Sequence, residues 1–188
     1  MNAEDIHDQP IKAIHVLSSG TVEQHPEHRS GTRAPQWCWV LTSRRWVEAP
    51  LHYFAFEHRD GLVLFDTGLD PAIASDPRYI SSTIGQFLLR RIFRLQIGPE
   101  DALDRKMQSL GLSASDVRLA VISHLHFDHV GGLEALREAW HPVVYGPDNP
   151  AIGGIDKRVG SGDKVTVLGI EFDVLEVPGH TLDHIAYF

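Results

Sequence analysis

The sequence predicts an α/β fold, with a mixed sheet or two sheets and helices outside them. Short apolar runs typical of strands occur in the first and last thirds of the chain. Segments with helical spacing of apolar residues separate them in the middle. This order of strands, helices, a buried strand, a helix and strands again is typical of layered α/β domains.

The composition is that of one globular domain. A chain of 188 residues can bury a core without disulfides, and Cys38 is its only cysteine. The sequence contains no run of about 18 apolar residues, so no membrane span is predicted. Its first ten residues lack the features of a signal peptide. The net charge of −8 argues against nucleic acid as the main partner. We therefore expect a cytoplasmic protein with a small-molecule substrate and neither a nucleic-acid nor a membrane partner.

Residues 1–35 are expected to form a polar N-terminal arm, and residues 36–188 the domain itself. The arm contains one possible edge strand, Ile11–Leu17. Polar breaks separate the three strand-like runs with which the domain begins. These runs are Trp37–Leu41, Leu51–Phe56 and Gly61–Phe65.

Two helices are predicted between residues 82 and 110. In 82–96 the apolar residues recur with helical spacing and three arginines lie on the other side. Pro99 is suited to open a second helix over 99–110, and Gly111 to follow its end. The nearly continuous apolar run Val117–Ile122 is typical of a buried strand, and a further helix is expected near 131–139.

The last part of the chain is predicted to be mostly strands. The candidate strands are Val143–Tyr145, Lys164–Leu168, Glu171–Val177 and Ile185–Phe188, with Gly169 in a hairpin turn. Since the chain stops inside the last of these without a closing helix, we expect a domain that is incomplete at its C-terminus.

The strongest chemical feature is the run SHLHFDH at residues 123–129. Residues i and i+2 of an extended chain face the same side, so His124 and His126 can direct both imidazoles at one point. Asp128 and His129 follow where the chain turns into a helix. Imidazole and carboxylate together suit zinc, manganese or iron. The run therefore predicts a transition-metal site, and twelve histidines in an acidic chain agree with it.

This run resembles the H-x-H-x-D-H motif of the metallo-β-lactamase superfamily. The segment LFDTG at residues 64–68 resembles the D-T-G that ends a strand in this family, and PGHT at 178–181 resembles its P-G-H-T motif. The three segments occur in the family's order, and the resemblance covers roughly residues 37–188. It implies the family's αβ/βα sandwich, with the first half complete and the second half partial.

The resemblance also implies a set of site residues. The metal ligands would be His124, His126 and His180 for a first ion, and Asp128 and His129 for a second. The implied cofactor is one or two Zn²⁺ ions, with iron or manganese as alternatives. Asp66 would orient the side chains of the metal ligands without binding a metal itself, or would only form the turn after the strand. Dinuclear members carry a bridging Asp and a last His further along, and Asp183 is too close to His180 to be that Asp.

The chain resembles two branches of the superfamily. Residues 37–133 resemble N-acyl-homoserine-lactone lactonases, and residues 143–188 resemble glyoxalase II, the hydroxyacylglutathione hydrolase. Both imply attack of a metal-bound hydroxide on a carbonyl, with Asp128 as the catalytic residue that holds the nucleophile. Ser123 and His184 are expected to be structural.

We favour a hydrolase that opens a lactone or ester. The alternatives are a glyoxalase II-type thioester hydrolase and a catalytically impaired metal-binding fragment. An exposed apolar face at the incomplete second sheet would make self-association of such a chain possible.

Overall fold

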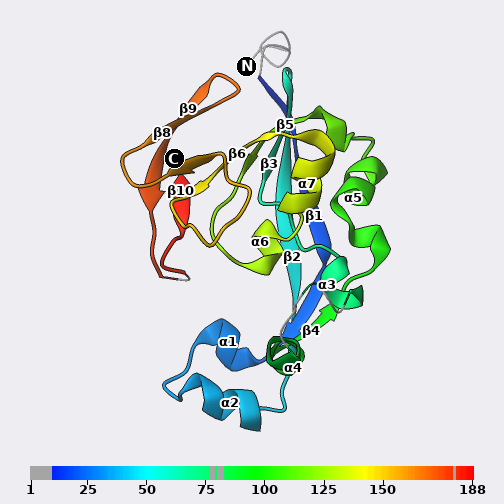
Figure 1. Ribbon diagram of the computed structural model, residues 1–188, viewed down its shortest axis with the longest axis vertical. Helices are drawn as coiled ribbons and strands as arrows, with labels where there is room; N and C mark the ends of the chain where they lie inside the picture. The colour runs from blue at the N-terminus through cyan, green and yellow to red at the C-terminus, as the bar shows by residue number, and fades with distance from the viewer. Residues whose placement is uncertain (1–9, 77–78, 80–82, 180) are drawn as a thin grey trace, which may run out of the picture.

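The computed structural model describes residues 10–76, 79, 83–179 and 181–188, and these form three layers (Figure 1). Within them, a seven-stranded sheet of order β4-β1-β2-β3-β5-β6-β7 stands beside a three-stranded sheet of order β10-β9-β8. Helices α5 and α7 lie on the face of the large sheet that is turned away from the small one. The predicted α/β class, with two sheets and external helices, is confirmed.

The strands of the large sheet are β1 (Ile11–Gln24), β2 (Val47–His58), β3 (Gly61–Phe65), β4 (Phe93–Gln96), β5 (Val117–Val121), β6 (Val143–Pro147) and β7 (Lys157–Val159). Those of the small sheet are β8 (Lys164–Val167), β9 (Ile170–Glu176) and β10 (Ile185–Tyr187). Pairing is antiparallel from β4 to β3 and parallel from β3 to β7. The parallel strands therefore end at one common edge.

The helices are α1 (Pro26–Ser30), α2 (Gln36–Thr42), α3 (Ala72–Ser75), α4 (Thr83–Ile92), α5 (Leu103–Ser109), α6 (Phe127–Val130) and α7 (Leu133–Trp140). Short 3₁₀ turns cover Pro99–Asp101 and Ala114–Asp116. Among the described residues, none of these helices has the length and apolarity to span a membrane.

Both faces of the central strands are buried in apolar cores. On one face Leu64, Ala120 and Val144 pack with Met107 of α5 and Leu136 of α7. On the other face the large sheet packs against the small one. The residues there are Val63, Leu119, Val121, Val165, Val174 and Ile185. Because successive side chains of a strand alternate between faces, a strand buried on both sides needs the nearly continuous apolar runs seen in β3 and β5.

The strand predicted at Trp37–Leu41 is wrong, because these residues belong to helix α2. A short apolar run fits either structure, and here the tertiary context decides. Trp39 and Val40 are buried on one side of the helix, while Trp37 and Leu41 on the other side are exposed. Pro35 directly precedes the helix, where its fixed φ costs nothing.

The helix predicted over 82–96 is correct only to Ile92. From there the chain forms β4, which pairs with Thr21–Gln24 of β1. This pairing buries Phe93 and Leu95 against a third apolar cluster, so it outweighs their helical spacing. The strand expected at Ile11–Leu17 extends to Gln24. Strand β7 and the short helices α1, α3 and α6 were not predicted.

Candidate metal centre

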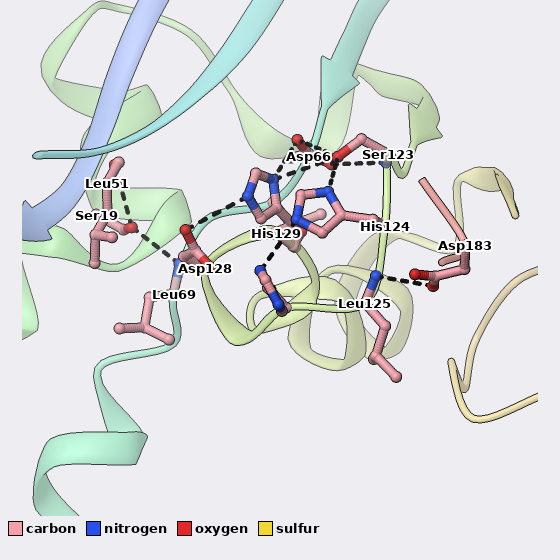
Figure 2. A network of polar contacts seen from close by, with 12 residues as sticks. Ser19, Leu51, Asp66, Leu69, Ser123, His124, Leu125, Asp128, His129 and Asp183 are labelled. Atoms are coloured by element: carbon pink, nitrogen blue, oxygen red, sulfur yellow. Dashed lines mark hydrogen bonds and ion pairs between the residues drawn. The ribbon is translucent and has the colours of Figure 1, made fainter. Parts of the chain in front are cut away.

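The topology of the sheet brings the D-T-G segment to the H-x-H motif. Strands β3 and β5 are parallel neighbours with Phe65 opposite Val121, so the residues after both strands emerge at the same edge. The backbone N–H of Asp66 donates to the carbonyl of Val121 over 2.8 Å. As a result Asp66 and Ser123 lie side by side (Figure 2).

The carboxylate of Asp66 joins strand β5 to helix α6. It is 3% exposed, and it accepts hydrogen bonds from the backbone N–H of Ser123 at 2.9 Å and from the Ser123 hydroxyl at 3.0 Å. Nδ1 of His129 lies 2.6 Å from its other oxygen. Asp66 has a φ of +62°, a left-handed conformation that Asp adopts more readily than most residues. The carboxylate thus fixes the start of the H-x-H loop and the ring of His129 together.

These bonds determine which nitrogens carry protons. A carboxylate only accepts, so the Ser123 hydroxyl and Nδ1 of His129 both donate to Asp66. The oxygen of Ser123 then accepts from Nδ1 of His124 at 2.9 Å. In the neutral rings of His124 and His129 the lone pair is therefore on Nε2, the atom that would bind a metal ion.

Asp66 also changes the acidity of His129. Burial disfavours the charged ring, but the hydrogen bond to Asp66 and the charges of Asp66 and Asp128 outweigh it and raise the pKa of His129 above its usual value. Oδ2 of Asp128 lies 3.4 Å from Nε2 of His129. The site therefore concentrates negative charge around its imidazoles and attracts cations.

The spacing of two ligand pairs fits a zinc ion. Nε2 of His124 and Nδ1 of His126 are 3.2 Å apart. Two nitrogens bound to one tetrahedral zinc, each about 2.0–2.1 Å from it, lie about 3.3 Å apart. The 3.4 Å between Asp128 Oδ2 and His129 Nε2 suits a second ion in the same way.

The structure brings four of the five predicted ligands together. The fifth, His180, lies outside the described residues. Within the described part of the chain, no group of three His, Cys, Asp or Glu side chains is arranged as a metal shell. The two pairs therefore provide donors of the right chemistry and spacing, and a complete shell needs at least one further ligand such as His180.

Hydrogen bonds connect the D-T-G turn to the segment that runs from helix α6 to the start of helix α7. The N–H and hydroxyl of Thr67 both donate to the carbonyl of His129, at 2.8 and 2.9 Å, and the N–H of Gly132 donates to the carbonyl of Gly68 at 3.1 Å. A Cβ atom on Gly132 would lie 2.6 Å from the carbonyl oxygen of Thr67. A side chain at this position would therefore force the two loops apart.

Replacing Gly132 with alanine is expected to lower the free energy of unfolding by about 1–3 kcal/mol. The reason is the backbone clash with Thr67, which a rigid carbonyl cannot relieve. Gly153→Ala is the matched control, because its Cβ would meet nothing within 4 Å. Urea unfolding of both variants measures the difference, and equal stability of the two would contradict this close contact between the two loops.

A pocket of about 490 Å³ opens beside His124 and His129. Phe54, Phe65 and Tyr187 form an aromatic wall, with successive ring centroids 6.5 and 6.2 Å apart. Burial raises the pKa of the Tyr187 hydroxyl, so this wall stays uncharged at neutral pH. The pocket thus combines an apolar side with a polar floor at the candidate metal ligands, a combination typical of small-molecule sites.

Three residues near the ligands have contacts that sequence reasoning missed. Ser123, expected to be structural, connects His124 to Asp66. The ring of His184 lies 4.6 Å from that of His124, and Asp183 accepts a hydrogen bond from the backbone N–H of Leu125. The only signals in the sequence were adjacency to a predicted ligand for Ser123 and proximity to His180 for the other two.

Known protein sequences resemble this chain over part of their length. The sequence pattern of the metallo-beta-lactamase superfamily matches residues 50–188. A protein of Pseudomonas fluorescens named hydroxyacylglutathione hydrolase is 43% identical over 95 residues, which are 49% of this chain and 36% of that protein. One of the same name from Chromohalobacter salexigens is 49% identical over 78 residues, which are 42% of this chain and 29% of that protein. The matched segments are thus only 36% and 29% of these two relatives.

Solved structures match a larger share of this chain. An N-acyl homoserine lactone hydrolase, with N-hexanoyl-L-homoserine bound at its catalytic metal center, superposes with a TM-score of 0.69. Its identity is 17%, over 96% of this chain and 71% of that one. A subclass B3 metallo-β-lactamase of Bradyrhizobium japonicum gives a TM-score of 0.50 at 17% identity, over 72% of this chain and 49% of that one. At such identities the likeness shows the fold.

Proposed function

Because the chain belongs to the metallo-β-lactamase superfamily, we propose that it is a metal-dependent hydrolase that opens a lactone or an ester. The observation that carries this proposal is the spacing of 3.2 Å between Nε2 of His124 and Nδ1 of His126. These two nitrogens stand at the distance that a shared zinc ion requires, and His124 lines the pocket with the aromatic wall.

In this proposal His124, His126 and His180 hold the first ion, and Asp128 and His129 contribute to a second. Zinc is the metal that this donor set suits best, with iron and manganese as alternatives. A bound ion supplies a Lewis acid, which makes water a nucleophile near neutral pH and polarises a carbonyl. Asp66 and Ser123 keep the imidazoles in the orientation that presents Nε2.

We assign to Asp128 the role of holding the attacking water and accepting its proton. Its side chain is 36% exposed and its Oδ2 stands 3.4 Å from Nε2 of His129, so its carboxylate is accessible to water while it remains near the proposed ligands. Ser123 is not suited to be a nucleophile. Its hydroxyl is buried and donates to Asp66 while it accepts from His124.

The lining of the pocket favours a lactone or ester with an apolar acyl group. The aromatic wall of Phe54, Phe65 and Tyr187 offers apolar surface for such a group. The second candidate is a glutathione thioester, which the 43% identity to a hydroxyacylglutathione hydrolase favours.

Substrate comparison tests this proposal. The zinc-loaded protein is expected to hydrolyse an N-hexanoyl-homoserine lactone with a kcat/KM at least about tenfold above that for S-lactoylglutathione, because an apolar wall discriminates by roughly that much. A chelator should abolish both activities. Faster turnover of the thioester would replace the first candidate with the second, and turnover of neither above that of free Zn²⁺ would contradict the proposed function.

A further inference from the structure

The segment that follows P-G-H-T lies alongside the H-x-H motif. The N–H of Ile185 donates to the carbonyl of Ser123 at 3.1 Å. The N–H of Leu125 donates to Oδ2 of Asp183, also at 3.1 Å (Figure 2). Between these two bonds the ring of His184 faces that of His124, with centroids 4.6 Å apart. The backbone on both sides of His124 is thus fastened to residues 183–185.

The carboxylate of Asp183 has a second partner from another loop. The same oxygen, Oδ2, accepts from the side-chain amide of Asn149 at 2.9 Å. The amide oxygen of Asn149 accepts from the N–H of Ala151 at 2.9 Å, so the amide must present its NH₂ group to Asp183. Burial opposes ionisation, but several hydrogen bonds, of which the one from Asn149 has the largest effect, outweigh it and hold the pKa of Asp183 below its ordinary value. Asp183 is therefore an anion that connects three loops.

Leu125 is the residue between two predicted ligands, and its position matters for both. Any shift of its peptide group changes the direction of the His124 and His126 side chains together. A metal site needs its ligands within about 0.5 Å of the productive arrangement, so a backbone hydrogen bond at this residue acts directly on the site. Asp183 also comes three residues after His180, on the segment that carries the remaining ligand predicted for the first ion.

We propose that Asp183, supported by Asn149, is a positioning residue of the metal centre, which holds the Leu125 backbone so that His124 and His126 bind one ion. This inference rests on the proposed metal-dependent function. It predicts that the pattern of donors and acceptors between positions 183 and 149, rather than the carboxylate as such, sets the affinity for the metal.

Three single variants separate these possibilities. In Asp183→Ala the N–H of Leu125 and the amide of Asn149 both lose their acceptor. In Asn149→Asp two carboxylates face each other. In Asp183→Asn an amide oxygen in the place of Oδ2 can still accept from both Leu125 and Asn149, so this variant keeps the hydrogen bonds and removes only the charge.

The readout is the dissociation constant of Zn²⁺, measured by competition with a chromophoric chelator, together with the visible absorption of the Co²⁺-loaded protein. Asp183→Ala and Asn149→Asp are each expected to bind Zn²⁺ about 10–100-fold more weakly, which is usual when a residue that orients the ligands is lost. Asp183→Asn should bind Zn²⁺ within about threefold of the unaltered protein, with the original Co²⁺ spectrum. Asp148→Asn is the matched control: it removes a carboxylate one residue from Asn149 that is exposed to solvent.

The outcomes distinguish this inference from the proposed function. If the unaltered protein does not bind Zn²⁺, the proposed function fails, and the inference fails with it. If it binds Zn²⁺ and Asp183→Ala and Asn149→Asp bind it equally well, only the inference is overturned. Weak binding in Asp183→Asn, with the metal-free protein destabilised in parallel in all three variants, would reduce Asp183 to a role in folding and would also overturn it.

Discussion

Replacing both His124 and His126 with alanine is expected to remove tightly bound zinc and to lower hydrolysis by about 10³-fold or more. The two nitrogens that stand 3.2 Å apart are the core of the proposed first metal site, and two of its three predicted ligands are lost together. Without the ion, several kcal/mol of transition-state stabilisation disappear, and each 1.36 kcal/mol corresponds to a factor of ten in rate.

Elemental analysis of protein purified without added metal, with initial rates on the same sample, measures this effect. His141→Asn is a suitable control, because it removes an exposed imidazole at the end of α7 and asparagine tolerates the positive φ of 50° there. The control should keep its zinc and its activity. Unchanged zinc content in the double variant would contradict the assignment of His124 and His126.

Asp66 is the second position with a large expected effect. Asp66→Ala should lower the free energy of unfolding by about 3–5 kcal/mol, because it leaves the buried N–H and hydroxyl of Ser123 and Nδ1 of His129 without their acceptor. Asp66→Asn should largely keep the fold, since its oxygen still accepts from Ser123 and asparagine adopts left-handed φ readily. Its NH₂ group, however, would face Nδ1 of His129.

Because that nitrogen must then accept, the proton of the neutral His129 ring moves to Nε2, the atom that would bind the second ion. Asp66→Asn is therefore expected to weaken the binding of that ion about 10–100-fold at nearly unchanged stability. Zinc titration and urea unfolding of both variants measure the two effects, with the exposed Asp60→Asn as the control. Equal zinc affinity of Asp66→Asn and the unaltered protein would show that Asp66 only forms the turn.

The parts of the fold predicted correctly are those in which burial alone decides the structure. Val117–Val121 is apolar nearly throughout because both of its faces are covered. Trp37–Leu41 was assigned wrongly because its burial depends on contacts made by the whole N-terminal region. Phe93–Gln96 was assigned wrongly because its partner, Thr21–Gln24, is about 70 residues away in the chain.

The candidate site, too, could be predicted from the sequence only in part. Four of its candidate ligands lie within six residues, so their convergence could be predicted from the strand that precedes them. Asp66 could be placed only by resemblance, since its contact with Ser123 depends on the parallel pairing of β3 and β5. The hydrogen bond between Asp183 and Leu125 could not be predicted from the sequence, because its donor is a backbone N–H that every residue except proline carries.

A crystal structure of the zinc-loaded protein, with anomalous diffraction measured at the zinc edge, tests the central claim most directly. The proposed function predicts an anomalous peak about 2.0–2.1 Å from both Nε2 of His124 and Nδ1 of His126, with His180 as a further ligand. A zinc peak elsewhere on the protein, with His124 and His126 unbound at full zinc loading, would contradict it.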